Sequence, residues 1–288
     1  MALKRHIAAV LIVAAAAAGA ISGTMAHAAS PTVIAAAQSS NPFSSLVGKR
    51  RERRSGRQGA AEIERYVLAS DDRVFLFENQ TDEARVTFLC GDGDQRLDCV
   101  LDQNGAAPEI YMLRPTRGPR GDVIYKNVEG ETLLRIASYG GATVFWPGGM
   151  RGFAASKSFG DDAALRLPRL GLADAVRRAQ AATAVISAAT GAPIMFNVGA
   201  APTPETTQDA TVLADAVVRA ADGLKKVADD PTGARVIASR IANVTFIEGE
   251  APGVSLEENT LEIRYVPNSD ISGRPSSTAV ARFLEETL

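Results

Sequence analysis

The segment VTFLCGDGDQRLDCVL, residues 86–101, contains both cysteines of the chain, Cys90 and Cys99. Alternating apolar residues on either side of a Gly- and Asp-rich centre are typical of a β-hairpin. Residues 93–96 would then connect two strands that carry the cysteines at facing positions. Such positions allow a Cys90–Cys99 disulfide with little distortion of either strand. We therefore expect a disulfide-stapled hairpin whose second strand is residues 97–101.

The N-terminus carries the pattern of an export signal. A basic start precedes an apolar run from Ile7 to Ile21, and Ala26, His27 and Ala28 supply a small-x-small cleavage site. This layout predicts a signal peptide over residues 1–28. The run is shorter than the ~20 apolar residues that a membrane span needs. We expect a periplasmic or secreted protein with no membrane span after cleavage, a location in which a disulfide is favoured.

Residues 29–60 differ in composition from the rest of the chain. They mix Ala, Ser, Pro and Gln with a basic run from Lys49 to Arg57, and they offer little apolar surface to offset the entropy of ordering. We interpret them as a mobile basic leader, either a solvated tether or a patch that touches an anionic surface. Eight of the 31 basic and one of the 33 acidic residues precede residue 59, so the remainder carries a net charge of −9. We expect no nucleic-acid partner.

Residues 61–150 show the pattern of short strands separated by turns. Candidate strands cover residues 65–69, 74–78, 85–90, 97–101, 109–113, 123–126, 132–137 and 143–146. Strands of this length and spacing predict an antiparallel sandwich or a partly open barrel. We interpret residues 151–170 as a connector to the second half.

Residues 171–288 show helical periodicity interrupted by strands. The second expected helix begins at Thr206 and has an apolar stripe that includes Leu213, Val217 and Leu224. The order of elements predicts a small antiparallel sheet covered by helices, and the two halves together predict an α+β protein. The other expected helices cover residues 172–189, 234–241 and 276–288, and the expected strands cover 193–198, 244–247 and 260–266.

Several segments carry a resemblance to a known family. They are residues 109–115, 119–127, 133–136, 140–145 and 273–277, the last of which reads Gly-Arg-Pro-Ser-Ser. Together they resemble a family of secreted bacterial proteins catalogued as a domain of unknown function. The resemblance covers most of the chain after the signal peptide and is most specific from Arg120 to Phe145. It implies no activity, because none is assigned to the family.

The histidine and cysteine content excludes several kinds of site. Both histidines, His6 and His27, lie in the expected signal peptide. The mature chain would therefore lack Ser-His-Asp and Cys-His arrangements and His-based metal sites. Asp92-Gly93-Asp94 offers alternating aspartates, but Arg96 stands where a third calcium ligand belongs, so a polar turn is the simpler interpretation. We expect no metal and no cofactor.

The only tryptophan, Trp146, ends a candidate strand, with Arg114, Arg117 and Arg120 upstream of it. The simpler interpretation is that Trp146 is buried at the junction of the two halves. The alternative is a stacking platform for a glycan or a peptide, with the three arginines around an anionic ligand.

We expect a non-catalytic binding or scaffolding role in the cell envelope, with a glycan, an anionic polymer or a protein as the partner. One alternative is a glycan-active enzyme that uses two carboxylates. Another is an inhibitor that presents the hairpin tip to a secreted enzyme. No catalytic residue is singled out, because many acidic residues are equally eligible: Asp92, Asp94, Asp98, Asp102, Glu109, Asp122, Glu129 and Glu131.

Overall fold

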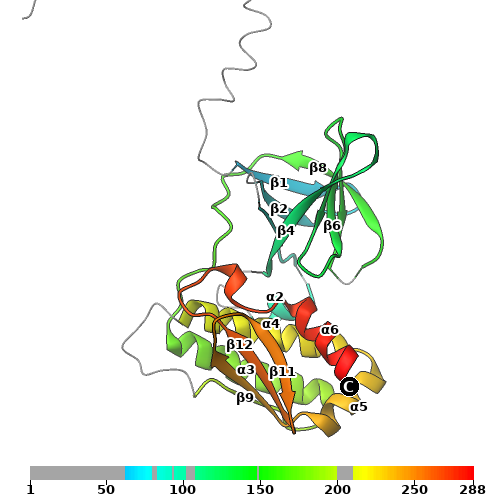
Figure 1. The fold of residues 1–288 in the computed structure, drawn as a ribbon. Helices are drawn as coiled ribbons and strands as arrows, with labels where there is room; N and C mark the ends of the chain where they lie inside the picture. Colours follow the sequence, from blue (N-terminus) through cyan, green and yellow to red (C-terminus); the bar gives the residue numbers. More distant parts are fainter. Residues whose placement is uncertain (1–61, 80–82, 93, 102–107, 148, 200–209) are drawn as a thin grey trace, which may run out of the picture. The chain divides into compact units, whose positions relative to one another are not determined.

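The structure is a computed structural model that describes residues 62–79, 83–92, 94–101, 108–147, 149–199 and 210–288 (Figure 1). The expected signal peptide and basic leader, the helix start at Thr206, and Asp102 lie outside these residues. Within the described part of the chain, no helix has both the length and the apolar character to cross a membrane.

In the first half of the described chain, eight antiparallel strands form a closed barrel (Figure 1). The barrel closes because β1 pairs with both β2 and β8, and closure leaves no unpaired strand edge. Alternate side chains point inward, and their aromatic rings pack together, with Tyr66 and Phe75 stacked 4.9 Å apart. The strands are β1 (Glu62–Leu68), β2 (Val74–Asn79), β3 (Ala84–Phe88), β4 (Ile110–Arg117), β5 (Val123–Lys126), β6 (Thr132–Ile136), β7 (Ala142–Phe145) and β8 (Gly152–Ser158).

The antiparallel β architecture agrees with the sequence interpretation, but the barrel is closed rather than a sandwich or partly open. Strand β8 lies inside residues 151–170, which we interpreted as a connector. The strand is hard to recognise because its residues are mostly small or polar and exposed, without apolar alternation. It is the strand that pairs with both β1 and β7 and so completes the barrel.

The expected hairpin is wrong. Residues 97–100 form the short helix α2 (Leu97–Val100) instead of a strand. Leu97 and Leu101 are four residues apart, so they lie on one side of a helical turn, and both pack in the core around helix α4 (Ala210–Ala228). Apolar residues at positions 97 and 101 fit either period, and burial against α4 selects the helix. The Cys90–Cys99 disulfide is nevertheless present, with Cα atoms 5.7 Å apart.

The second half contains a four-stranded sheet in the order β11-β12-β10-β9. Its strands are β9 (Met195–Asn197), β10 (Asn243–Glu248), β11 (Gly253–Glu257) and β12 (Thr260–Tyr265). Strand β10 is parallel to both neighbours, and β11 is antiparallel to β12. The expected antiparallel sheet is therefore wrong. Helices α4 and α5 (Pro231–Arg240) lie between β9 and β10 in the chain. A helical crossover of this kind brings the chain back to the end of the sheet at which β9 began, so β10 runs parallel to β9.

Helices α3 (Leu172–Thr190) and α4 lie against one face of this sheet (Figure 1). Helix α4 is buried along nearly its whole length, and helix α6 (Ser277–Thr287) packs against it. Helix α6 begins after Ser276, whose hydroxyl accepts a hydrogen bond from the Ala279 amide as an N-cap. Two short 3-10 turns, η1 (Pro119–Gly121) and η2 (Ile271–Gly273), complete the described elements.

Candidate functional site

Helix α4 carries a buried stripe of charge. Asp215, Arg219 and Asp222 follow one another at helical spacing, and all three are buried. The side chain of Arg219 is 1 % exposed, and its guanidinium nitrogens lie 3.4 to 3.7 Å from carboxylate oxygens of Asp215, Glu109 and Asp98. These approaches are ion-pair contacts, since the Arg219 nitrogens have no hydrogen-bond acceptor among the described residues.

The segment that precedes and begins helix α6 completes the cluster. The Arg274 Nε donates to an oxygen of Asp215 at 2.6 Å, and Arg274 Nη1 lies 3.6 Å from Glu109. The amide and the hydroxyl of Ser277 both donate to the Glu109 carboxylate. Lys226 donates to the Ser277 hydroxyl at 2.6 Å. We call Asp98, Glu109, Asp215, Arg219, Arg274 and Ser277 the buried ion cluster.

The positive charges of the buried ion cluster favour the ionised form of two of its carboxyl groups, Glu109 and Asp215. Burial alone would raise the pKa of Glu109, but the positive charges of Arg219, Arg274 and Lys226 outweigh burial and keep that pKa below its usual value. The same balance, with Arg219 and Arg274 as the main cations, lowers the pKa of Asp215. Because the carboxylates of Glu109 and Asp215 face compensating cations, we assign the cluster a structural role: it joins α2 and β4 to α4 and α6.

Sequence reasoning did not find this cluster. It identified the apolar stripe of helix α4 and made no prediction for the charged stripe, since a charged face of a helix usually is solvated. The available signal was the opposite-charge spacing of Asp215 and Arg219. That spacing occurs equally on exposed helices, so it does not reveal burial.

A cavity of about 470 Å³ lies beside the buried ion cluster. Glu109 and Arg274 form part of its wall, together with side chains from β4, the turn after β5, the approach to β11, and α6. We call it the apolar cavity, because most of its remaining lining is apolar: Ile110, Met112, Val128, Pro252, Val254, Ile271, Pro275, Ala279 and Phe283.

Arg114, one of the arginines selected from the sequence, lines the apolar cavity. It is exposed on β4 and stands directly opposite Lys126 on β5. Within the described part of the chain, neither side chain has an ion-pair partner or a side-chain hydrogen bond. Two cations therefore face each other across a strand pair without a carboxylate between them.

Trp146 lines a different cavity, of about 700 Å³, which we call the tryptophan cavity. The indole is 8 % exposed and packs edge-on against Phe88, with ring centroids 4.7 Å apart. Two guanidinium groups lie over it, those of Arg73 at 4.5 Å and Arg96 at 5.4 Å from the ring centroid. Neither arginine lines the cavity, and the charged residues in its wall are Glu131, Lys226, Asp229, Arg282 and Glu285.

The structure thus separates the residues that the sequence grouped as one ligand site. Arg114 lines the apolar cavity and Trp146 lines the tryptophan cavity, whereas Arg117 and Arg120 line neither. The arginines beside Trp146 are Arg73, just before β2, and Arg96, just before α2, and both lie far upstream in the sequence.

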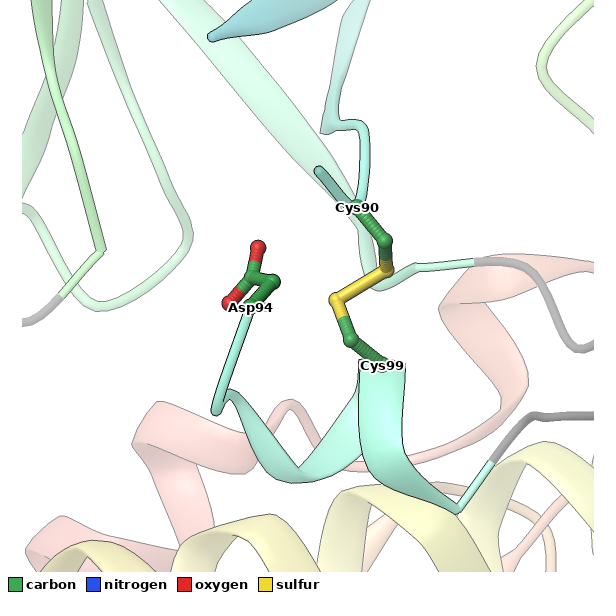
Figure 2. Close-up of side chains that lie close together, drawn as sticks. All are labelled: Cys90, Asp94 and Cys99. Atoms are coloured by element: carbon green, nitrogen blue, oxygen red, sulfur yellow. A yellow bond between two sulfur atoms is a disulfide. The ribbon is translucent and has the colours of Figure 1, made fainter. Parts of the chain in front are cut away.

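Figure 2 shows Asp94 beside the Cys90–Cys99 disulfide. One ligand-type atom from each of the three residues lies within 4.8 Å of the others. The two sulfurs are bonded to each other, and Asp94 forms an ion pair with Arg96 at 2.9 Å. Partial burial would raise the pKa of Asp94, but its hydrogen bonds with Arg96 lower that pKa below the usual value. This arrangement stabilises the turn and offers no thiolate to a metal.

Comparison with known proteins yields one family. A model described as a domain of unknown function (DUF4908) matches residues 42–284. No curated protein and no solved structure matches the chain.

Proposed function

The chain belongs to this family, DUF4908, and on that premise we propose that it is a non-catalytic binding protein of the cell envelope whose ligand carries an anionic group. The signal peptide expected from the sequence supports export to the periplasm or beyond it. The disulfide is compatible with such a location. The partner is an envelope component, either a glycan, an anionic polymer or a protein, that presents the anionic group.

The observation that carries the proposal is the pairing of Arg114 with Lys126. Like charges directly opposite each other destabilise an antiparallel strand pair. Since neither cation has a carboxylate partner among the described residues, their repulsion is uncompensated within that part of the chain. An anionic group between them would replace this repulsion with two charge-assisted hydrogen bonds.

Binding of methanesulfonate, followed by NMR titration of the mature protein, tests the proposal. We expect R114Q and K126Q each to weaken binding about tenfold or more, because a hydrogen bond to a charged group contributes about 1.5–3 kcal/mol. R117Q is the matched control, since it removes the same charge from the same strand outside the cavity. Equal weakening by R117Q would contradict the assignment of the site to Arg114 and Lys126.

The pH and salt dependence of this binding provides a second test. A sulfonate, an arginine and a lysine all keep their charges between pH 6 and 8, so affinity should stay nearly constant over that range. Added salt should weaken binding, because Arg114 is exposed and Lys126 is only half-buried, so dissolved ions can screen both charges. A bell-shaped pH profile centred near neutrality would contradict the proposal.

The tryptophan cavity favours a second candidate, a glycan-active enzyme. Its wall holds the carboxylates of Glu131, Asp229 and Glu285, and a pair of carboxylates is what glycoside hydrolysis requires. An enzyme should release reducing ends from peptidoglycan, and E131Q or E285Q should abolish the release. If protein that binds methanesulfonate releases no reducing ends from peptidoglycan, the enzyme is contradicted and the binding function stands. We do not propose the inhibitor, because the hairpin on which it depended is replaced by helix α2.

A further inference from the structure

The apolar walls of the cavity indicate what the uncharged part of the ligand would be. Arg114 and Lys126 would contact its anionic group, and the rest of the ligand would lie against these walls. Met112 on β4, Val254 on β11 and Phe283 on α6 contribute apolar side chains from three separate elements. Val128, at the same cavity, is 64 % exposed. Its apolar surface is uncovered beside Arg114, so a polar anion alone would leave the apolar walls in contact with water.

The other charged groups in the wall already have partners. Glu109 accepts two hydrogen bonds from Ser277, and Arg274 pairs with Asp215. Glu129 accepts a hydrogen bond from the Ser276 hydroxyl. Among the described lining residues, Arg114 is the cation that lacks a partner, so a ligand's charge would be held at that end of the cavity.

We propose that the apolar cavity binds one molecule of an amphiphilic anion. The anionic head, a carboxylate, phosphate or sulfate, contacts Arg114 and Lys126, and an acyl-like chain packs against Met112, Val254 and Phe283. The cavity volume of about 470 Å³ lies within the roughly 300–1,000 Å³ that small-molecule sites occupy. This inference rests on the proposed function, because it uses the same two cations and adds the class of ligand.

The test compares decanesulfonate, used as a monomer, with methanesulfonate, which has the same head and no chain. We expect decanesulfonate to bind at least about tenfold more tightly, because its chain leaves water on binding. A279F should remove this difference by filling the cavity from helix α6 while methanesulfonate still binds. T278F is the matched control, since Thr278 lies on the same helix and lines the tryptophan cavity. If A279F does not fold, V254F fills the same cavity from β11.

The outcomes separate this inference from the proposed function. Equal binding of the two sulfonates would overturn the amphiphile and leave the anion site intact, whereas binding of neither by folded protein would overturn both. Loss of decanesulfonate binding in T278F but not in A279F would place the chain in the other cavity and overturn the assignment. Decyltrimethylammonium has the same chain as decanesulfonate and a positive head. If it binds as tightly as decanesulfonate, the proposed role of Arg114 and Lys126 is overturned. Binding to anionic lipid vesicles without binding of the monomer would show a membrane-surface contact and also overturn the inference.

Discussion

The hydroxyl of Ser277 donates a hydrogen bond to the carboxylate of Glu109, a residue 168 positions earlier in the chain. Both side chains are buried, with Ser277 at 0 % and Glu109 at 1 % exposure. This bond joins the start of helix α6 to the residue that precedes strand β4. It belongs to the buried ion cluster, in which two further elements, α2 and α4, supply charges.

Replacing Ser277 with alanine should reduce the free energy of unfolding by about 1.5–3 kcal/mol, the usual range for a hydrogen bond to a charged group. Urea unfolding measures the loss. S239A is the control, because Ser239 is exposed and its hydroxyl donates, among the described residues, to the nearby Val236 carbonyl. We expect it to change stability by no more than about 0.5 kcal/mol. Similar losses in the two variants would contradict a special role for Ser277.

Replacing Arg219 with methionine should cost about 3–5 kcal/mol, because it leaves the buried carboxylates of Asp98, Glu109 and Asp215 without their shared cation. The control is K225M on the same helix, whose ion-pair partner Asp229 is 61 % exposed. Such a pair contributes about 0.3–0.5 kcal/mol. Thermal and urea unfolding of both variants provide the comparison, and a loss below about 1 kcal/mol in R219M would show that the cluster tolerates the missing charge.

Stability should fall as the solution becomes acidic. Glu109 and Asp215 have folded-state pKa values below their usual ones, so the unfolded chain binds protons that the folded chain does not. Their contribution is therefore complete above the unfolded pKa values, near 4, and is lost as pH falls below them. The free energy of unfolding, measured from pH 7 to pH 3, should decrease more steeply in the unmodified protein than in E109Q/D215N. Parallel curves would contradict the lowered pKa values.

The Cys90–Cys99 bond should be complete in protein purified without reductant, so thiol titration after denaturation should find no free thiol. Because the bond closes a short loop, C90A/C99A should lose about 2–3 kcal/mol of stability. C90A alone should lose about as much, since either change breaks the bond. Two free thiols per chain would show that the cysteines remain reduced.

The sequence predicted where helices and strands lie along the chain better than it predicted which elements pack or pair with one another. The barrel strands at 74–79, 123–126 and 132–136 coincide with short apolar runs bounded by turn residues, and the cause of such a pattern is local. Residues 97–100 and the partners of β10 depend on contacts with distant elements, and there the local pattern led to the wrong structure.

The candidate site divides in the same way. Arg114 and Trp146 could be selected as residue types from the sequence. The facing position of Lys126 comes from the register of β4 and β5, which neither strand specifies alone. The separation of Trp146 from Arg114 into two cavities likewise depends on how helix α6 packs beside the strands.

The amino-acid sequence by itself determined a β-rich first half, a second half of helices and strands, and a cysteine pair close enough to bond. These features depend on period, turn residues and short separations along the chain. Only the tertiary structure decided that the barrel closes, that residues 97–100 are helical, and that Arg219 is buried among carboxylates. The physical reason is that closure depends on β8, about 90 positions after β1, and that burial depends on residues more than a hundred positions away. A charged stripe on a helix has the same sequence pattern whether water or another element covers it.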